Sequence, residues 1–189
     1  MEGIFDSHAH YDAEQFDEDR DVLLDRLPSL GVVGVVNAAS NLAYSRTSIA
    51  LAERYPYVYA AVGIHPEEAG ALTDEDLREL RRLYAHPKVV AIGEIGLDYY
   101  YDDNAPRETQ RLIFEQQLAL AKDLDVPVII HNRDAHQDTL ELLKKYRPKG
   151  IMHCFSGSAE TAREVLKLGL HIGFTGVLTF KNARKAPEV

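Results

Sequence analysis

Residues 89–94 read VVAIGE, a run of apolar and small residues that ends directly in a carboxylate. A continuous apolar run of this length is typical of a strand in a sheet that is covered on both faces. Glu94 cannot stay charged and unpaired in such surroundings, so it needs a metal ion, an arginine or water beside it. Gly93 and Gly96 flank this carboxylate and allow the backbone to turn tightly there. The stretch therefore predicts a strand that delivers a functional acid.

Four other short apolar runs lead into histidines in the same way. They occupy residues 4–5, 58–64, 126–130 and 151–152. The first run is followed by His8 and His10, and the other three by His65, His131 and His153 in turn. In a barrel of parallel strands, the carboxyl ends of all strands face one way, so residues far apart in the chain can meet at one mouth. Imidazoles and a carboxylate gathered there predict a site for divalent metal ions.

The segments between these runs have the spacing of helices. The expected strands are residues 3–5, 32–36, 57–64, 89–93, 126–130, 150–153 and 170–174. The expected helices are residues 17–30, 41–55, a segment that Thr73 opens, 106–124, a segment that Asp134 caps, and 158–169. Strands that alternate with crossover helices predict right-handed parallel β/α units. We expect one α/β domain over residues 1–189, of the TIM-type (β/α)8 barrel class.

The strand count is one short of a full barrel. Such a barrel needs eight strands and usually about 250 residues, with about 200 near the lower limit, whereas this chain has 189 residues and seven expected strands. We therefore expect an incomplete barrel that lacks its eighth strand, with open edges that allow self-association. The chain could be a fragment, which we favour, a short chain completed by a partner, or a doubly wound sheet instead of a barrel.

The composition restricts the partners. With 30 acidic and 21 basic residues the net charge is −9, which argues against a broad basic surface that tracks phosphates. A nucleic-acid enzyme stays possible because cations in a small cleft can supply positive charge locally. Cys154 is the single cysteine, so no intrachain disulfide can form, which suits a reducing compartment. No apolar run reaches the ~18 residues of a membrane span, and no signal peptide is visible, so we expect a cytoplasmic protein.

The histidines and Glu94 have alternative interpretations. His8 and His10 lie two apart, so a strand directs both rings to one side; otherwise they are incidental loop histidines. Glu94 could bridge two cations through its two oxygens, or it could form an ion pair with Arg133. His131 alone would more often be a hydrogen-bonded histidine than a ligand, and the set of donors favours ligation. The same holds for His153.

Other polar and aromatic residues have weaker signals. His65 could instead contact the substrate or a leaving oxygen. We expect Cys154 to be a small buried residue that points away from the site. The tyrosines of residues 99–101 could stack on a base or pack at the rim, and neither is favoured. Three further histidines are expected to be structural, namely His86, His136 and His171.

Five blocks of sequence together resemble a known family. The blocks are residues 7–10, 63–66, 93–99, 130–135 and 153–158, and they read SHAH, GIHP, GEIGLDY, IHNRDA and HCFSGS. In this order they resemble the TatD family of metal-dependent deoxyribonucleases, within the amidohydrolase-like (β/α)8 superfamily. The resemblance implies one cation on His8 and His10, a bridging Glu94, and a second cation on His131 and His153. It also implies a sixth ligand, an aspartate after an eighth strand, which these 189 residues do not contain.

The resemblance implies 3′–5′ exonuclease activity on DNA, bound at a small cleft. Two cations about 3.5–4 Å apart would stabilise the attacking and leaving oxygens, Arg133 would neutralise phosphate and His65 would hold the scissile group. Four histidines and a glutamate suit Zn²⁺, Mn²⁺ or Fe²⁺, while the family's activity is associated with Mg²⁺. We expect Zn²⁺-like ions to bind and Mg²⁺ or Mn²⁺ to support turnover. The rivals are an amidohydrolase acting on an amide, lactone or phosphotriester, and a non-catalytic metal-binding fragment.

Overall fold

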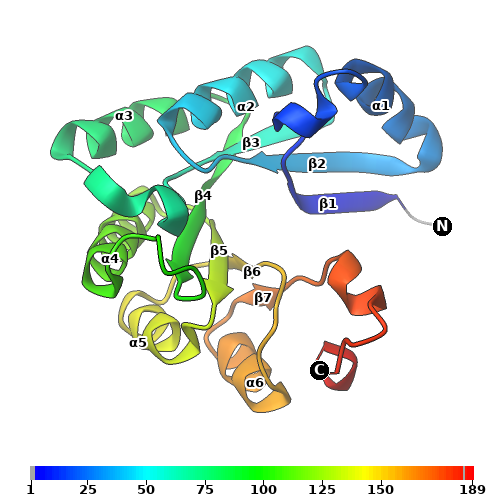
Figure 1. Ribbon diagram of the computed structural model, residues 1–189. Coiled ribbons are helices and arrows are strands. Elements are labelled where there is room, and N and C mark those ends of the chain that lie inside the picture. The colour runs from blue at the N-terminus through cyan, green and yellow to red at the C-terminus, as the bar shows by residue number, and fades with distance from the viewer. Residues whose placement is uncertain (1–2, 185) are drawn as a thin grey trace.

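The computed structural model describes residues 3–184 and 186–189, and its centre is one parallel sheet of seven strands (Figure 1). The strands are β1 (Ile4–Ala9), β2 (Val32–Ala38), β3 (Val58–Val62), β4 (Val89–Asp98), β5 (Val128–Arg133), β6 (Gly150–Met152) and β7 (His171–Ile172). Their order in the sheet is the order in the chain. A doubly wound sheet reverses direction at a switch point, so that alternative is wrong. The sheet is a half-barrel, as the TIM-type prediction requires.

Six helices connect the strands and cover the outside of the half-barrel (Figure 1). They are α1 (Arg20–Arg26), α2 (Leu42–Arg54), α3 (Asp74–Tyr84), α4 (Arg107–Leu124), α5 (His136–Tyr146) and α6 (Ala159–Lys167), with short 3-10 turns at Glu14–Phe16, Leu27–Leu30, Pro66–Ala71, Gly176–Thr179 and Ala186–Glu188. Among the described residues, no helix combines the length and apolar content that a membrane crossing requires.

Polar side chains cap the starts of three of the six described helices, α2, α3 and α6. The side chain of Thr73 accepts a hydrogen bond from the Asp76 amide at 3.2 Å, while the Asp76 carboxylate accepts one from the Thr73 amide at 2.8 Å. This reciprocal pair satisfies two amides that the helix leaves unpaired. The expected cap at Asp134 is wrong, because α5 starts after Ala135 without a side-chain cap and Asp134 adopts a left-handed φ of 53°.

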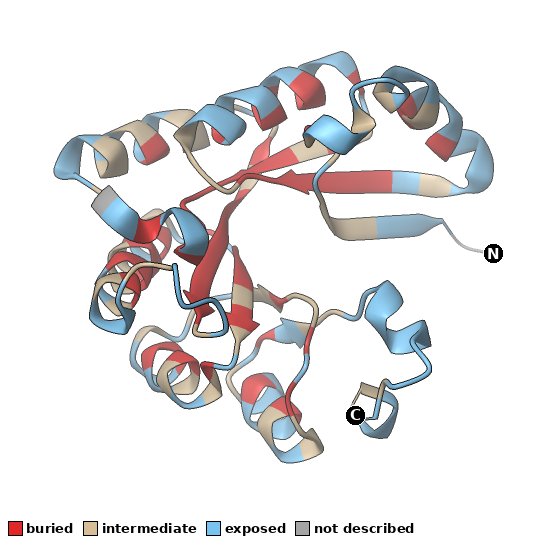
Figure 2. Cartoon of the chain, in the orientation of Figure 1, coloured by how far each residue is buried: buried red, intermediate tan, exposed pale blue. Residues whose placement is uncertain are grey.

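The core lies between the sheet and the helices. Alternate residues of a strand face opposite sides of the sheet. One set of strand side chains packs against fully buried helix side chains such as Leu80 of α3 and Phe114 and Leu118 of α4. The other set, Val36, Ala61, Ala91 and Ile129, forms a smaller cluster. Figure 2 shows that burial concentrates along β2 to β5. Leu112 of α4 lies outside this core and is 57% exposed.

Four strands, β1, β2, β4 and β5, extend beyond the apolar runs that predicted them. β1 continues through His8 to Ala9, and β4 continues through Glu94 to Asp98. The polar side chains are accepted in these strands because pairing with β2 and β5 satisfies the backbone. The outermost strands, β1 and β7, do not pair with each other, and Phe5 on β1 is 56% exposed. The expected open edges are therefore present.

Candidate metal centre

Glu94 is the buried centre of the site. It lies within β4, its residue is 3% exposed, and its amide donates to the Ala39 carbonyl at 2.9 Å. Two residues later, Gly96 has a φ of +152°, and a Cβ there would lie 1.9 Å from the carbonyl oxygen of His131. Glycine at this position therefore lets β5 approach β4 closely, which brings His131 against the carboxylate.

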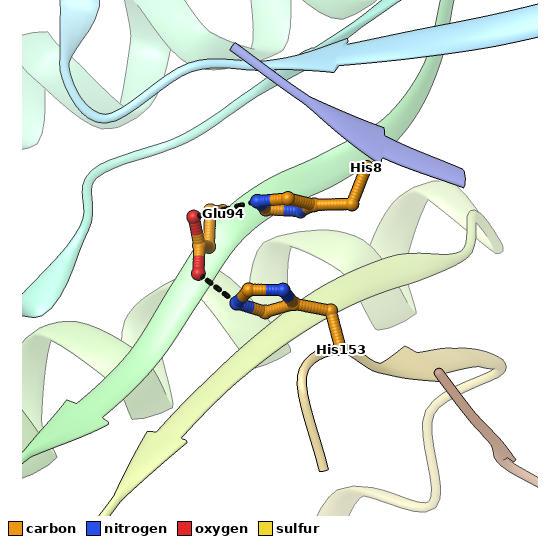
Figure 3. Close-up of side chains that lie close together, drawn as sticks. All are labelled: His8, Glu94 and His153. Atoms are coloured by element: carbon orange, nitrogen blue, oxygen red, sulfur yellow. Dashed lines mark ion pairs between the residues drawn. The ribbon is translucent and has the colours of Figure 1, made fainter. Parts of the chain in front are cut away.

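Five imidazoles surround this one carboxylate. His8 Nε2 lies 3.3 Å and His10 Nε2 3.5 Å from one oxygen, Oε2. On the other oxygen, Oε1, the contacts are His131 Nδ1 at 3.0 Å, His65 Nε2 at 3.6 Å and His153 Nε2 at 2.5 Å. Figure 3 shows the rings of His8 from β1 and His153 from the end of β6 lying one above the other, each with a nitrogen directed at the Glu94 carboxylate. The structure thus brings together every histidine that the sequence proposed for the site.

The ligand atoms form two groups that share Glu94. One group is His8, Glu94 and His153, and the other is His65, Glu94 and His131; within each, the atoms lie within 4.8 Å of one another. The rings of His8 and His153 are stacked, with centroids 3.8 Å apart and an angle of 12°. The resemblance pairs His8 with His10 and His131 with His153, so the allocation of histidines to individual ions stays a prediction.

Hydrogen bonds decide which ring nitrogen of His10 and His131 faces the centre. His10 Nδ1 lies 2.8 Å from the Ala38 carbonyl, and a carbonyl can only accept, so Nδ1 carries a proton and Nε2 faces Glu94. His131 Nε2 lies 2.9 Å from the Asp98 carboxylate, so Nε2 carries a proton and Nδ1 faces Glu94. Both rings are therefore oriented as metal ligands are, with the second nitrogen held by an oxygen.

Buried nitrogens without a partner fit a metal site. His153 Nε2 is buried against Glu94 Oε1 at 2.5 Å. His153 Nδ1 and His8 Nδ1 are buried and have no hydrogen-bond partner. A buried polar atom normally has one, because leaving it unpaired costs about 1–3 kcal/mol. His8 Nε2 also lies 2.8 Å from His10 Nε2, so two ligand atoms crowd the same space. A cation between the imidazoles and Glu94 would relieve this crowding of His8 Nε2 and His10 Nε2.

His65 differs from the other four histidines. Its Nδ1 accepts a hydrogen bond from the Glu67 amide at 3.3 Å, so in the neutral ring the proton is on Nε2. That N–H points toward Glu94 Oε1, 3.6 Å away. A protonated nitrogen cannot bind a metal, so this geometry supports the prediction that His65 contacts substrate.

The charges of the site are strongly coupled. Burial alone would raise the pKa of Glu94, but hydrogen bonds from His10, His131 and other histidines hold this pKa well below its usual range. Burial lowers the pKa of His131, and the contacts to Asp98 and Glu94 outweigh it and raise that pKa to about 9. Burial also lowers the pKa of His8. Glu94 is therefore an ionised carboxylate in the folded protein.

Two functional residues were not proposed from the sequence. Asp98 is fully buried and holds His131, and the stretch IGLD at residues 95–98 repeats the signal of an apolar run that ends in a carboxylate. Asn37 is also fully buried, and its side chain donates to Asp12 at 2.8 Å and accepts from the Tyr11 amide at 2.6 Å. The hydrogen bond from the Tyr11 amide fixes the segment that follows His10.

The remaining candidates lie around the mouth. Arg133 stacks over Tyr100, and among the described residues no ion pair joins it to Glu94, so the ion-pair alternative is wrong. Tyr99 donates to Asp138 at 2.7 Å, which is rim packing. Cys154 is half-buried, not part of the core, and contacts Thr175 Oγ1 at 3.3 Å. It follows the end of β6, so strand alternation does not set its direction.

The three histidines expected to be structural lie outside the cluster around Glu94. His86 pairs with Glu53 at 3.1 Å, His136 starts α5, and His171 is exposed on β7. A cavity of about 330 Å³ opens beside the cluster, and its lining includes Ser7, His8, His153 and Thr175. The site is thus open on the side of β1 and β7.

Comparison with known proteins gives one consistent result. The sequence profile of the TatD related DNase family matches residues 5–189. The metal-dependent hydrolase YabD of Bacillus subtilis, itself uncharacterized, is 44% identical over 98% of this chain and 74% of its own length. The 3′-5′ ssDNA/RNA exonuclease TatD of Musicola paradisiaca is 40% identical over 92% of this chain and 67% of its own. The crystal structure of YjjV, a TatD homologue from Escherichia coli, has a TM-score of 0.89 at 36% identity over 97% of this chain and 72% of that one.

Proposed function

We propose, from the premise that this chain belongs to the TatD related DNase family of metal-dependent hydrolases, that it cleaves phosphodiester bonds of single-stranded nucleic acid from the 3′ end. One observation carries the proposal. Glu94, a single buried carboxylate, has the His8 and His10 nitrogens beside Oε2 and the His131 and His153 nitrogens beside Oε1, which is the arrangement that a bridged pair of divalent ions needs. The exonuclease activity named for the Musicola relative supplies the substrate class.

The proposed ligands are His8, His10, Glu94, His131 and His153. Imidazole nitrogen suits Zn²⁺, Mn²⁺ and Fe²⁺ better than Mg²⁺, so we expect a Zn²⁺-like ion to bind tightly and Mn²⁺ or Mg²⁺ to support turnover. When bound, the two ions would supply Lewis acidity to the phosphodiester and to the attacking water.

The other residues act on the substrate directly. The Nε2–H of His65 is aimed at the centre of the site and would donate to a phosphate or leaving-group oxygen. Arg133 ends β5 two residues after His131, so it reaches the same mouth and would pair with a phosphate. Asp98 positions the His131 ring and does not touch the substrate. The proposed substrate therefore lies across the carboxyl ends of β4 and β5.

The proposal is tested with purified protein and a 5′-labelled single-stranded oligonucleotide. We expect shortening from the 3′ end that a chelator abolishes and Mn²⁺ or Mg²⁺ restores. Glu94→Gln removes the shared charge and should lose both ions by elemental analysis together with at least 100-fold of the activity. Glu79→Gln on α3, where the carboxylate pairs with Arg46 and Arg82 and not with a site histidine, is the matched control and should lose neither.

Two results would overturn the proposal. Full metal content in Glu94→Gln would remove the bridging role of this carboxylate. Cleavage that resists the chelator, or turnover of amides or lactones without any phosphodiester hydrolysis, would assign the site a different reaction.

A further inference from the structure

An exposed pair of tyrosines lies beside the metal centre and is not used by the mechanism above. Tyr100 and Tyr101 directly follow β4 and are 55% and 43% exposed. Their rings contact each other edge to face, with centroids 4.9 Å apart and an angle of 86°. Large aromatic surfaces left open beside an active site are typical of ligand contacts.

Arg133 completes this group. Its guanidinium lies 3.7 Å from the centre of the Tyr100 ring and 4.8 Å from that of Tyr101, and its Nη1 donates to the Tyr101 hydroxyl at 3.0 Å. Among the described residues, no carboxylate forms an ion pair with Arg133. The guanidinium is therefore stacked, oriented and still free to meet an anion. We call Tyr100, Tyr101 and Arg133 the rim platform.

Hydrogen bonds tie the rim platform to the metal centre. The amide of Tyr100 donates to one oxygen of Asp98 at 3.0 Å, and the other oxygen of Asp98 holds His131 at 2.9 Å. The amide of Tyr99 donates to the Arg133 carbonyl at 3.0 Å. Because one carboxylate fixes both Tyr100 and His131, the platform and the ligand ring keep a defined relative position. Such preorganisation lowers the entropy lost on binding.

We propose that the rim platform is a nucleobase subsite of the proposed exonuclease, and the inference rests on that function. A base would stack on the open ring of Tyr100 while Arg133 meets the adjacent phosphate. Stacking suits a nuclease that does not select sequence, because every base has an aromatic face. Charge cannot supply the affinity here, since Asp102 and Asp103 follow the tyrosines and the net charge is −9.

The test compares a strand with and without bases. The probe is a fluorescein-labelled hexathymidylate with hydrolysis-resistant phosphorothioate links, and its partner has abasic sites at the last three 3′ positions. We expect the full-length protein to bind the base-bearing strand about 5- to 100-fold more tightly, the range that stacking of one base produces. Tyr100→Leu should remove most of this preference, whereas Tyr100→Phe, which keeps the ring, should preserve it.

A matched control is available on the opposite end of the molecule. Tyr146, at the end of α5, also lies beside a cation, with Lys145 Nζ 5.3 Å from its ring. Tyr146→Leu should keep the preference for bases. Binding should also depend weakly on salt: the logarithm of the association constant should fall against the logarithm of salt concentration with a slope of about −0.7 for one phosphate contact on a single strand.

The outcomes separate this inference from the proposed function. Equal affinity for base-bearing and abasic strands, or full preference in Tyr100→Leu, overturns the subsite even if the protein is a nuclease. A salt slope of several units assigns binding to charge and overturns it as well. Absence of phosphodiester hydrolysis with every metal overturns the proposed function and is read from the cleavage assay alone.

Discussion

Asp98→Asn should weaken metal binding although Asp98 touches no ion in the proposed site. Two donors converge on this buried carboxylate: His131 Nε2–H on one oxygen at 2.9 Å and the Tyr100 amide on the other at 3.0 Å. Asparagine offers one acceptor oxygen and an NH₂ group that donates. The NH₂ group of the asparagine must therefore face another donor, either the Tyr100 amide or His131 Nε2–H. The alternative is that His131 moves its proton to Nδ1, the nitrogen that faces Glu94.

The size of the effect follows from the bond that is lost. A hydrogen bond to a charged group contributes about 1.5–3 kcal/mol, which corresponds to roughly 10- to 150-fold in an equilibrium constant at about 1.4 kcal/mol per tenfold. Outer partners of metal ligands typically change metal affinity by about 10- to 100-fold, so the two estimates agree. We expect the dissociation constant for Mn²⁺ or Zn²⁺ to rise by that factor in Asp98→Asn.

The assay is competition with a chelating dye on the purified full chain, with ¹⁵N spectra of the imidazoles to record which nitrogen carries the proton. Asp138→Asn is the control, because Asp138 accepts from neighbouring Tyr99 and pairs with Arg111 but contacts none of the site histidines. An unchanged dissociation constant in Asp98→Asn, or an equal loss in Asp138→Asn, would refute the reasoning.

Three further predictions concern the scaffold. Thr73→Ala should lower the free energy of unfolding by about 1 kcal/mol, measured by urea unfolding at pH 7. The Thr73 side chain and amide lower the pKa of Asp76, so the stabilisation is complete above the ordinary aspartate pKa near 4 and is lost as pH falls through the lowered pKa. The difference in unfolding free energy between wild type and Thr73→Ala should therefore shrink in acid. Gly96→Ala should cost about 1–3 kcal/mol in backbone strain alone, besides the clash with His131, and should reduce metal content; a wild-type melting curve would contradict it. The chain should associate with increasing concentration in sedimentation experiments through the β1 edge, and Phe5→Lys should reduce this association; a monomer at all concentrations would oppose the prediction.

The sequence predicted the order and type of the elements because each strand is a compact apolar run and each helix has an apolar stripe. It misplaced the ends of β1 and β4 by several residues. His8 and Glu94 lie within strands, since parallel pairing accepts polar residues wherever the inner face of the sheet holds their side chains. Local apolarity cannot reveal this, because it depends on the neighbouring strand.

The histidines of the site followed from their place after apolar runs, but their roles did not. Which nitrogen of His131 faces Glu94 depends on Asp98, and the proton on His65 depends on the Glu67 amide. These contacts arise from loop geometry that leaves no periodic pattern in the chain. The ion-pair alternative for Arg133 was wrong because the stacked tyrosines draw its guanidinium outward.

The stacked rings of His8 and His153 have a consequence for the mechanical integrity of the sheet. They belong to β1 and to the end of β6, which are never neighbours in the sheet, and they are 145 positions apart in the chain. An ion held by both rings and by the Glu94 carboxylate beside them would cross-link these two strands across the concave face of the half-barrel. Closing so long a loop removes much of the freedom of the unfolded chain, and metal binding of this kind contributes directly to folding free energy. The metal centre would then maintain the curvature of the sheet as well as bind the substrate. In metal-loaded protein, β1 and the end of β6 would separate far more slowly than in protein stripped of metal.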